Sequence, residues 1–444
     1  MQAIILAGGF GTRLRPLTYT IPKPMLPVAG KPAMGHIIES LANAGCSEVI
    51  VTTNYLAELV ADGLYALNPP IPVRCVTESK PLGTCGCVKN VIHELEDEFL
   101  VIQGDAVSYI DYKELINFHH ERDADVTISV MRVQDTREFG IVAMDADGRV
   151  NRFQEKPRPE EAFSQLANSG FYVLKKWVFD QVPFDETYDF SRQLFPALLA
   201  QNARVFSREM REYWVDIGRV QNYLEGNLHF IKGCATIDPT AIVSDSATLL
   251  PPFIIGAGSH IGNNCVIGPG TVMNNRCIVG DGAHISGSVL FDDVIIGPES
   301  RLTDCVVASN SRLGDHVHIE PLSVIGAGCD IGAHVQVCAH SRIGPLTPVS
   351  HGTEVNGIVS PRLQKLEGLQ RFMAQAPDYK DLPLEQLSIC ALLANSGEMT
   401  ARQLSESGEI SRTKVHTVIT ALEARGIILA TLDVPKRYAL THGT

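Results

Sequence analysis

Apolar residues recur every six positions through residues 235–360, and this repeat limits the possible fold more than any other feature of the chain. A period of six fits neither an α-helix nor an ordinary strand. It is the hexapeptide pattern of a parallel β-helix, in which one apolar residue per face points inward and three faces complete a triangular coil. The interval shortens to five after Ile285 and after Leu302, and the repeat then resumes. The residues expected to point inward are Ile237, Val243, Leu249, Ile255, Ile261, Ile267, Met273, Val279, Ile285, Leu290, Ile296, Leu302, Val307, Leu313, Ile319, Ile325, Ile331, Val337 and Ile343.

We therefore expect a left-handed parallel β-helix over residues 235–360. Each coil can bury its inner face only against neighbouring coils, so the module is first of all a scaffold. Such scaffolds often serve as assembly surfaces, which makes a homo-oligomer formed through the β-helix or the C-terminal domain an expectation.

Residues 1–234 follow a different pattern, in which short apolar runs alternate with helical segments. The expected strands are 3–7, 48–53, 73–78, 98–105, 125–133 and 170–174, and the expected helices are 32–45, 112–123 and 191–202. This alternation predicts an α/β domain with a mainly parallel sheet and helices on both faces. Ligands of such domains bind at the carboxyl ends of the strands.

The last part of the chain predicts a helix and linker over 361–384 and a small separate domain over 385–444. Three helical segments precede a hairpin, the order of a winged helix. Thr400 and Ser411 are expected N-caps, and Gly426 an expected C-cap.

Charge limits the partners. The whole chain carries a net charge of -13, which argues against a chain-wide nucleic-acid or membrane surface. Residues 361–444 hold ten basic and nine acidic residues, a net charge of +1. Nucleic-acid binding by this domain therefore stays open beside an oligomerisation or regulatory role. The side chains expected to contact nucleic-acid phosphates are Arg412, Lys414, His416, Lys436 and Arg437.

The chain shows no sign of membrane insertion or export. No apolar stretch reaches the roughly 18 residues of a spanning helix, and the start lacks the basic residues of a signal peptide. The eleven cysteines are scattered, which suits reduced core thiols, and the pair Cys85 and Cys87 is weak evidence for a metal. We expect a cytoplasmic protein.

The glycine-dense turn "AGGFGTRLRPLT", residues 7–18, follows the first apolar run. It is not a dinucleotide fingerprint, which needs glycine where Leu14 stands, and the chain has no Gly-Lys-Ser/Thr loop. Successive backbone N–H groups of such a turn form an anion site, to which Arg13 and Arg15 add forked donors. Lys23 lies between two prolines that hold its backbone extended. These groups together suit a nucleoside triphosphate.

Isolated acids and amides supply the remaining candidates. Asp105 ends one apolar strand and Asp216 follows another apolar stretch, as expected for a Mg²⁺ site completed by phosphate oxygens. In "FQEKP", Glu155 can accept hydroxyl donors and Lys156 can bind a second phosphate, while Asn168 could reach a polyol.

The chain resembles the sugar nucleotidyltransferases, or nucleotide-sugar pyrophosphorylases, and among them most resembles the mannose-1-phosphate guanylyltransferases. The resemblance covers residues 1 to about 360 and includes the β-helix. It is carried, in family order, by "GGFGTRLRPLT", "PKPMLPVAGKP", "ESKPLGTCG", "QGD", "EFGIVAMDADGRVNRFQEKP", "NSGFY" and "YWVDIGRVQNY". Tyr109 and Arg219 depart from it, standing where relatives commonly have aspartate and threonine.

The resemblance implies a Rossmann-like catalytic domain and a role for each matching residue. Nucleotide contacts are implied for Leu6, Ala7, Gly8, Gly9, Gly11, Thr12, Arg13, Lys23, Glu78 and Gly83. Sugar-phosphate contacts are implied for Gly140, Glu155, Lys156 and Asn168. Asp105 and Asp216 would bind Mg²⁺, and the catalytic set is Arg13, Lys23, Asp105, Lys156 and Asp216.

The implied reaction joins a sugar 1-phosphate, mannose 1-phosphate by resemblance, to the α-phosphorus of an NTP and releases pyrophosphate. Catalysis would consist of positioning and charge neutralisation. Glu78 stands where uridylyl- and thymidylyltransferases tend to have glutamine. A carboxylate only accepts hydrogen bonds, and guanine offers two adjacent donors, so Glu78 favours GTP.

Two alternatives remain from the sequence. The β-helix could transfer acyl groups from coenzyme A with a histidine as base. The candidate histidines are His260, His284, His316, His318, His334 and His340. The chain could also be a catalytically silent regulatory subunit that senses nucleotide sugars and binds DNA through its C-terminal domain.

Overall fold

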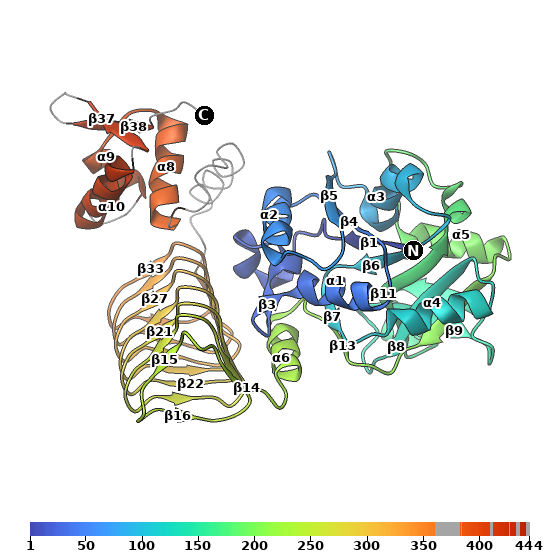
Figure 1. Cartoon of the computed structure of the whole chain (residues 1–444), viewed down its shortest axis with the longest axis horizontal. Helices are drawn as coiled ribbons and strands as arrows, with labels where there is room; N and C mark the ends of the chain where they lie inside the picture. The colour runs from blue at the N-terminus through green and yellow to red at the C-terminus, as the bar shows by residue number, and fades with distance from the viewer. Residues whose placement is uncertain (360–381, 383, 409–411, 426, 432–435, 441–444) are drawn as a thin grey trace. The chain divides into compact units, whose positions relative to one another are not determined.

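The first strand, β1 (Gln2–Leu6), forms the centre of an α/β sheet in the computed structural model (Figure 1). Its side chains alternate between two apolar cores, with Ala3 and Ile5 in one and Ile4 in the other. This two-sided burial is why the strand reads as an uninterrupted apolar run. The structure describes residues 1–359, 382, 384–408, 412–425, 427–431 and 436–440.

The sheet follows the order β10-β9-β11-β6-β1-β4-β5, with β8 paired to β11 and to β12. Its other strands are β4 (Val49–Thr53), β5 (Val73–Thr77), β6 (Glu98–Gln103), β8 (Val126–Arg132), β9 (Gly140–Met144), β10 (Val150–Glu155), β11 (Leu166–Lys175) and β12 (Val205–Glu209). Strands β6, β1, β4 and β5 are parallel, whereas β11 runs antiparallel to both β6 and β8. The prediction of a mainly parallel sheet is therefore wrong for the part around β11, which is mixed. The chain reaches β11, beside β6, directly from the hairpin of β9 and β10, without a helical crossover.

Helices cover both faces, as predicted. The helices α1 (Ala33–Asn43), α2 (Ala57–Leu67) and α4 (Tyr112–Glu121) contribute to the core that holds Ile5. The helices α3 (Gly83–Val91) and α5 (Phe195–Ala200) contribute to the core that holds Ile4. A π-helical turn, Phe190–Leu194, precedes α5 where one continuous helix was expected. Such turns are frequent at functional sites.

Residues 235–359 form stacked parallel strands consistent with the predicted left-handed β-helix. Strands of two or three residues, from β14 (Ala235–Ile237) to β35 (Ile358–Val359), make three parallel sheets of eight, seven and seven strands. Paired positions are 18 residues apart in regular coils, as for Ile261 and Val279. They are 17 apart where the repeat shortens, as for Ile285 and Leu302. Each five-residue interval thus shortens one corner and leaves the strand register intact.

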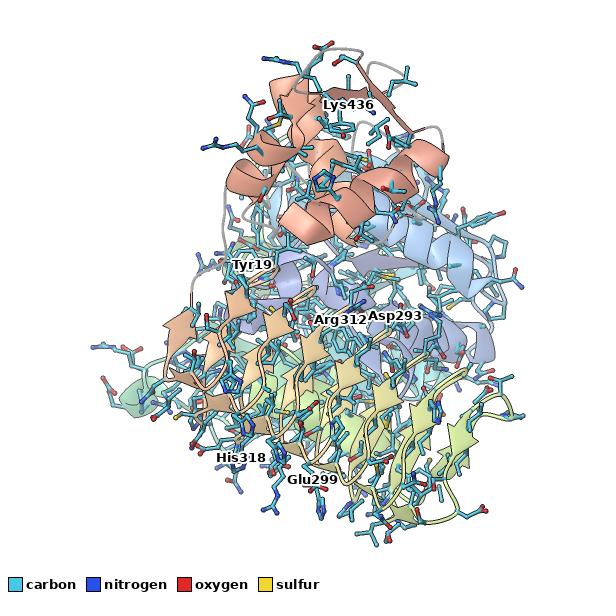
Figure 2. All side chains as sticks on the ribbon, turned by 90° about the vertical axis from the view of Figure 1, so that its left-hand side faces the viewer. Tyr19, Asp293, Glu299, Arg312, His318 and Lys436 are labelled. Carbon is cyan, nitrogen blue, oxygen red and sulfur yellow. The ribbon has the colours of Figure 1, made fainter. Side chains whose placement is uncertain are left out.

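The repeat identifies the inward side chains. All predicted positions from Ile255 to Ile343 are buried in one continuous core. Ile237, in the first coil, is 42% exposed, because that coil has another coil on only one side. Intervening side chains such as Arg312 and His318 point outward (Figure 2).

Serine corners are a feature that the apolar repeat did not reveal. Ser259, Ser300 and Ser311 are buried directly before a strand. The hydroxyl of Ser300 donates to Gly314 O and accepts the Val317 N–H, at 3.1 Å in both cases. These bonds satisfy backbone groups inside the corner, where no water can reach them.

The C-terminal domain follows the order α8 (Leu384–Ser396), β36 (Met399–Thr400), α9 (Ala401–Gly408), α10 (Arg412–Ala424), β37 (Ile428–Ala430) and β38 (Arg437–Leu440). Its three strands pair in the order β36-β38-β37. Thr400 caps α9, since its hydroxyl accepts the Gln403 N–H at 3.2 Å. The winged-helix designation stays a prediction.

Several predictions for this part lie outside the described residues: the helix and linker at 361–381, the caps at Ser411 and Gly426, and the side chains of Arg412 and Lys414. The chain divides into two compact units, residues 1–14 with 21–226 and residues 15–20 with 227–444. The predicted boundaries at 234, 360 and 384 stay predictions. Among the described residues, no helix has the length and apolar character needed to cross a membrane.

Candidate active site

A cavity of about 450 Å³ opens at the carboxyl ends of the parallel strands. Leu6 at the end of β1, Asn54 just after β4 and Gln103 at the end of β6 line it. This is where a parallel sheet is expected to bind a ligand.

All ten residues predicted to contact the nucleotide line this cavity, together with Asp105. Their roles stay predictions, but the fold brings them to one place from segments up to 77 residues apart. Five further polar residues that line the cavity had been given no role: Thr84 and Gln103 lie within quoted motifs, while Thr52, Asn54 and Asp189 lie outside them. Asn54 and Gln103 could have been found from their places at strand ends. Asp189 is joined to the cavity by a hydrogen bond from the Thr84 hydroxyl at 3.0 Å, which no sequence pattern indicates.

The glycine-dense turn closes with a short 3-10 helix, Thr12–Leu14. Leu14 is fully buried and its N–H donates to Gly11 O at 2.9 Å, so it fixes the turn. Arg13, beside it, lines the cavity. The Arg15 guanidinium lies 4.8 Å from the ring centroid of Tyr19, and its phosphate contact stays a prediction.

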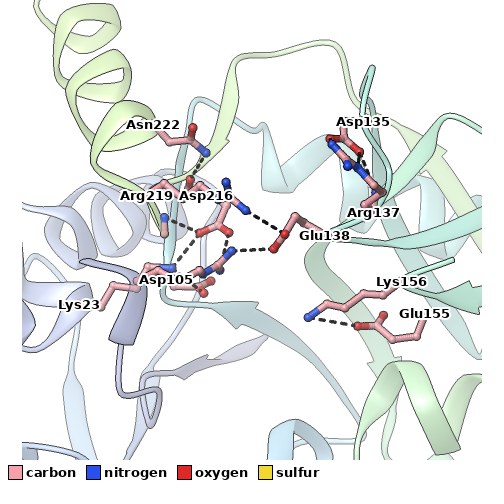
Figure 3. Close-up of polar contacts among 12 residues, drawn as sticks. Lys23, Asp105, Asp135, Arg137, Glu138, Glu155, Lys156, Asp216, Arg219 and Asn222 are labelled. Carbon is pink, nitrogen blue, oxygen red and sulfur yellow. Dashed lines mark hydrogen bonds and ion pairs between the residues drawn. The ribbon is translucent and has the colours of Figure 1, made fainter. Parts of the chain in front are cut away.

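Lys23 joins the two predicted metal ligands (Figure 3). Its Nζ donates to Asp105 Oδ2 at 2.9 Å and to Asp216 Oδ1 at 2.8 Å. The small strands β7 (Ala106–Ser108) and β13 (Trp214–Asp216) bring the two acids together, because Ala106 pairs with Asp216.

The Lys23 side chain is only 6% exposed, so its charge depends on these carboxylates. Burial alone would lower the pKa of Lys23, but the attraction of Asp105 and Asp216 outweighs it and the pKa is raised. Burial likewise opposes the charge of Asp105, yet Lys23 holds the pKa of that carboxyl below its usual value. Both groups are therefore charged at neutral pH.

A second ion-pair group adjoins the first. Glu138 accepts hydrogen bonds from Arg13 Nη1 at 2.8 Å and from Arg219 Nη2 at 2.9 Å. Arg13 Nη2 also lies 3.5 Å from Asp216 Oδ2. A Cβ at Gly218 would lie 2.8 Å from Arg13 Nη2, so any larger residue there would make the Arg13 side chain move. The three cations and three carboxylates of the two groups sum to zero charge.

The predicted sugar-phosphate residues form a separate group outside the lining of the cavity. A Cβ at Gly140 would lie 2.7 Å from Glu155 Oε2, so the glycine makes room for that carboxylate. Asn168 Nδ2 donates to the Tyr172 hydroxyl at 2.9 Å and to Ser191 Oγ at 3.4 Å. Lys156 Nζ is 4.0 Å from Glu155 Oε1 and extends toward the side where Asp105 lies (Figure 3).

Glu155 and Ser191 connect this group to the π-helical turn. Burial raises the pKa of Glu155, while Lys156 and a hydrogen bond from Ser191 act in the opposite direction. Ser191 was missed because no motif marks it.

Glu78 also lines the cavity. Its Oε2 accepts the Leu82 N–H at 3.1 Å, and Oε1 faces Gly8. Burial raises the pKa of Glu78, although the Leu82 N–H partly offsets this effect.

The cysteine pair and the β-helix histidines were the remaining candidates for chemistry. Cys85 and Cys87 are buried free thiols, and burial raises the pKa of Cys87 to about 12. Within the described part of the chain, no three His, Cys, Asp or Glu side chains are grouped to hold a metal ion. The six histidines considered as acyl-transfer bases are exposed, and two of them, His316 and His334, stack with ring centroids 4.8 Å apart.

Comparison with known proteins adds the family. The model of the "Nucleotidyl transferase" family matches residues 2–233, more than half of the chain, and that of the "EIF2B subunit epsilon LbH domain" matches residues 235–337. The chain belongs to the nucleotidyl transferase family. This nucleotidyltransferase therefore acts on a nucleotide and a sugar phosphate, and members of its family commonly use a divalent metal.

Two relatives and one solved structure are similar to this chain. A mannose-1-phosphate guanylyltransferase of Mycobacterium tuberculosis is 38% identical over 53% of this chain and 66% of its own length. A mannose-1-phosphate guanyltransferase of Debaryomyces hansenii is 31% identical over 81% of this chain and 100% of its own length. The crystal structure of HddC from Yersinia pseudotuberculosis complexed with GMP-PN is 32% identical and covers 52% of this chain and 99% of its own, with a TM-score of 0.46.

Proposed function

We propose that this nucleotidyltransferase transfers a guanylyl group from GTP to mannose 1-phosphate and releases pyrophosphate. The observation that carries the proposal is the meeting of the glycine-dense turn, Arg13, Lys23 and Asp105 around one cavity. The names of the two guanylyltransferase relatives support the choice of base and sugar.

The carboxylates of Asp105 and Asp216 fit a divalent cation, and we propose Mg²⁺. Their oxygens converge on one cationic nitrogen, Lys23 Nζ, so the two carboxylates lie close enough to share one cation. Two carboxylates are the usual protein share of a Mg²⁺ site, with phosphate oxygens and water as the other ligands. When bound, the ion would neutralise charge that develops on the transferred phosphoryl group.

The chemical step needs no protein nucleophile. An oxygen of the sugar phosphate forms a bond to the α-phosphorus of GTP, and the bond between that phosphorus and the bridging oxygen of the β-phosphate breaks. The electron pair of the broken bond leaves on pyrophosphate. No proton has to be transferred in this step. Arg13 and Lys23 neutralise the triphosphate, and Lys156 positions the attacking phosphate.

The sugar is held by the separate group that contains Glu155 and Asn168. Glu155 accepts hydrogen bonds from sugar hydroxyls, and Asn168 offers an amide that Tyr172 and Ser191 hold in place. The guanine is selected by Glu78, whose carboxylate accepts hydrogen bonds from the two adjacent donors of the base.

A matrix of GTP, UTP, dTTP and ATP against several sugar 1-phosphates, with Mg²⁺ and pyrophosphate release as readout, tests the proposal. We expect the highest kcat/KM for GTP with mannose 1-phosphate, and loss of release in Asp105→Asn. Equal rates with all four nucleotides would contradict the choice of base. Pyrophosphate release without a sugar phosphate would contradict the reaction.

Further assignments complete the proposal. The chain is proposed to be a cytoplasmic homo-oligomer, assembled through the β-helix or the C-terminal domain, and light scattering tests its mass. Nucleic-acid binding by the C-terminal domain is tested by a gel shift of the full chain at low and high salt.

A further inference from the structure

We infer that Arg219 and Arg13 form a two-arginine clamp for a substrate phosphate, and that Glu138 holds this clamp in the free enzyme. The inference rests on the proposed function, because that function supplies the phosphate. It adds two residues, Arg219 and Glu138, to those already assigned to the site.

The geometry of the clamp resembles that of a bound anion. The two guanidinium groups donate to different oxygens of one carboxylate, at 2.8 Å from Arg13 and 2.9 Å from Arg219. Arginine recognises carboxylate and phosphate through the same forked donors. A phosphate group that replaces the Glu138 carboxylate can therefore use both arginines without their rearrangement.

The position of the clamp fits a reacting phosphate. Arg13 contacts both Glu138 and Asp216, so the clamp directly adjoins the proposed metal site. Glu138 also lies between that cluster and the pair formed by Glu155 and Lys156 (Figure 3). A phosphate in this place would lie between the nucleotide half and the sugar half of the site.

The chain holds Arg219 in place for this contact. Arg219 directly precedes α6 (Val220–Phe230), while Gly218 before it donates its N–H to Asp216 Oδ1 at 2.8 Å. Asn222 in the first turn of α6 donates to Asp216 O at 2.9 Å. The segment that carries Arg219 is thus tied to a proposed metal ligand, although relatives commonly have threonine at this position.

Glu138 is placed to be displaced. Its side chain is 45% exposed, and those of Arg13 and Arg219 are 46% and 58% exposed. Exposed ion pairs contribute little to stability, so a more highly charged phosphate replaces the carboxylate easily. Glu138 therefore keeps the two arginines oriented, and offsets part of their positive charge, until the substrate binds.

Titration calorimetry of the full chain with inorganic pyrophosphate and Mg²⁺ tests the clamp. For Arg219→Ala we expect roughly tenfold weaker binding or more, the usual effect of losing one charged hydrogen bond. For Glu138→Gln we expect tighter binding by a few fold, because the competing carboxylate is gone. A gain of affinity cannot arise from misfolding.

The exposed pair Arg276 and Asp293 in the β-helix supplies the control. It is an arginine–carboxylate pair with two contacts of 2.7 Å, and neither residue belongs to the clamp. Arg276→Ala removes the same charge from the chain and should leave affinity and turnover unchanged. An equal loss of affinity in Arg276→Ala and Arg219→Ala would show that net charge alone causes the effect and would overturn the clamp.

Steady-state kinetics identify which substrate supplies the phosphate. If the clamp binds the triphosphate, Arg219→Ala raises the KM for GTP; if it binds the sugar phosphate, the KM for that substrate rises instead. Unchanged KM values together with unchanged pyrophosphate affinity would overturn the inference. Weaker pyrophosphate binding in Arg219→Ala, in a chain that shows no guanylyl transfer, would preserve the clamp and refute the proposed function.

Discussion

The β-helix and the nucleotide cavity are built from opposite kinds of side-chain contacts. The β-helix core consists of uncharged, mostly aliphatic side chains that repeat from coil to coil, so its stability is spread over many positions. At the edge of the cavity, three cations and three carboxylates meet in a few short contacts. A substitution in the first region should therefore change stability and leave chemistry alone, whereas one in the second should do the reverse.

The largest effect is expected for Asp105→Asn in the cavity. Loss of one charge that stabilises the transition state should lower kcat by roughly 10³-fold, or ~4 kcal/mol, while the chain stays folded. Pyrophosphate release measures it. Asp147→Asn, at a side chain that is 80% exposed, is the matched control and should keep full activity. Turnover near the normal rate in folded Asp105→Asn would remove the basis of the comparison.

In the β-helix, Ile319→Ala should cost ~3 kcal/mol of unfolding free energy, because it leaves a cavity at a fully buried position. We expect a lower urea midpoint and an unchanged kcat/KM in native buffer. Gln336→Ala on the outer surface should leave the midpoint in place. A large loss of activity in Ile319→Ala at temperatures where it is folded would show that the two regions are not independent.

A smaller effect is expected at the base. Glu78→Gln replaces one acceptor oxygen by a donor, so the preference for GTP over UTP should fall roughly 30-fold, or ~2 kcal/mol. Competition between the two nucleotides measures it. An unchanged preference would mean that backbone groups select the base.

The smallest effect is a pH dependence of a few fold. Burial raises the pKa of Glu78, so the carboxylate takes up a proton as the pH falls, at a higher pH than an ordinary glutamate. Protonation removes an acceptor for guanine, so the KM for GTP should rise toward acidic pH. The KM profile of Glu78→Gln should be flatter, and identical profiles in the two proteins would exclude Glu78 as the titrating group.

The two regions also differ in how far the sequence predicts them. The hexapeptide repeat identifies buried residues such as Ile296 and Ile331 one by one, because each environment is set by the local pattern. The glycine-dense turn and Lys23 could be found because their chemistry is concentrated in a short segment.

The charged network could not be found in this way. Glu138 and Arg13 are 125 residues apart, and only the folded sheet brings them together. Ser191 becomes notable only once the π-helical turn places it beside Asn168. Long-range pairs of common residue types leave no periodic signal.

The most direct test of the charge balance between Lys23 and its two carboxylates is the Mn²⁺ affinity of the full chain without nucleotide. Electron paramagnetic resonance measures this affinity. If Lys23 competes with a divalent ion for Asp105 and Asp216, Lys23→Met should bind Mn²⁺ at least about tenfold more tightly than the natural chain, since both carboxylates then lose the competing ammonium group. Equal affinity in the two folded proteins would contradict this arrangement.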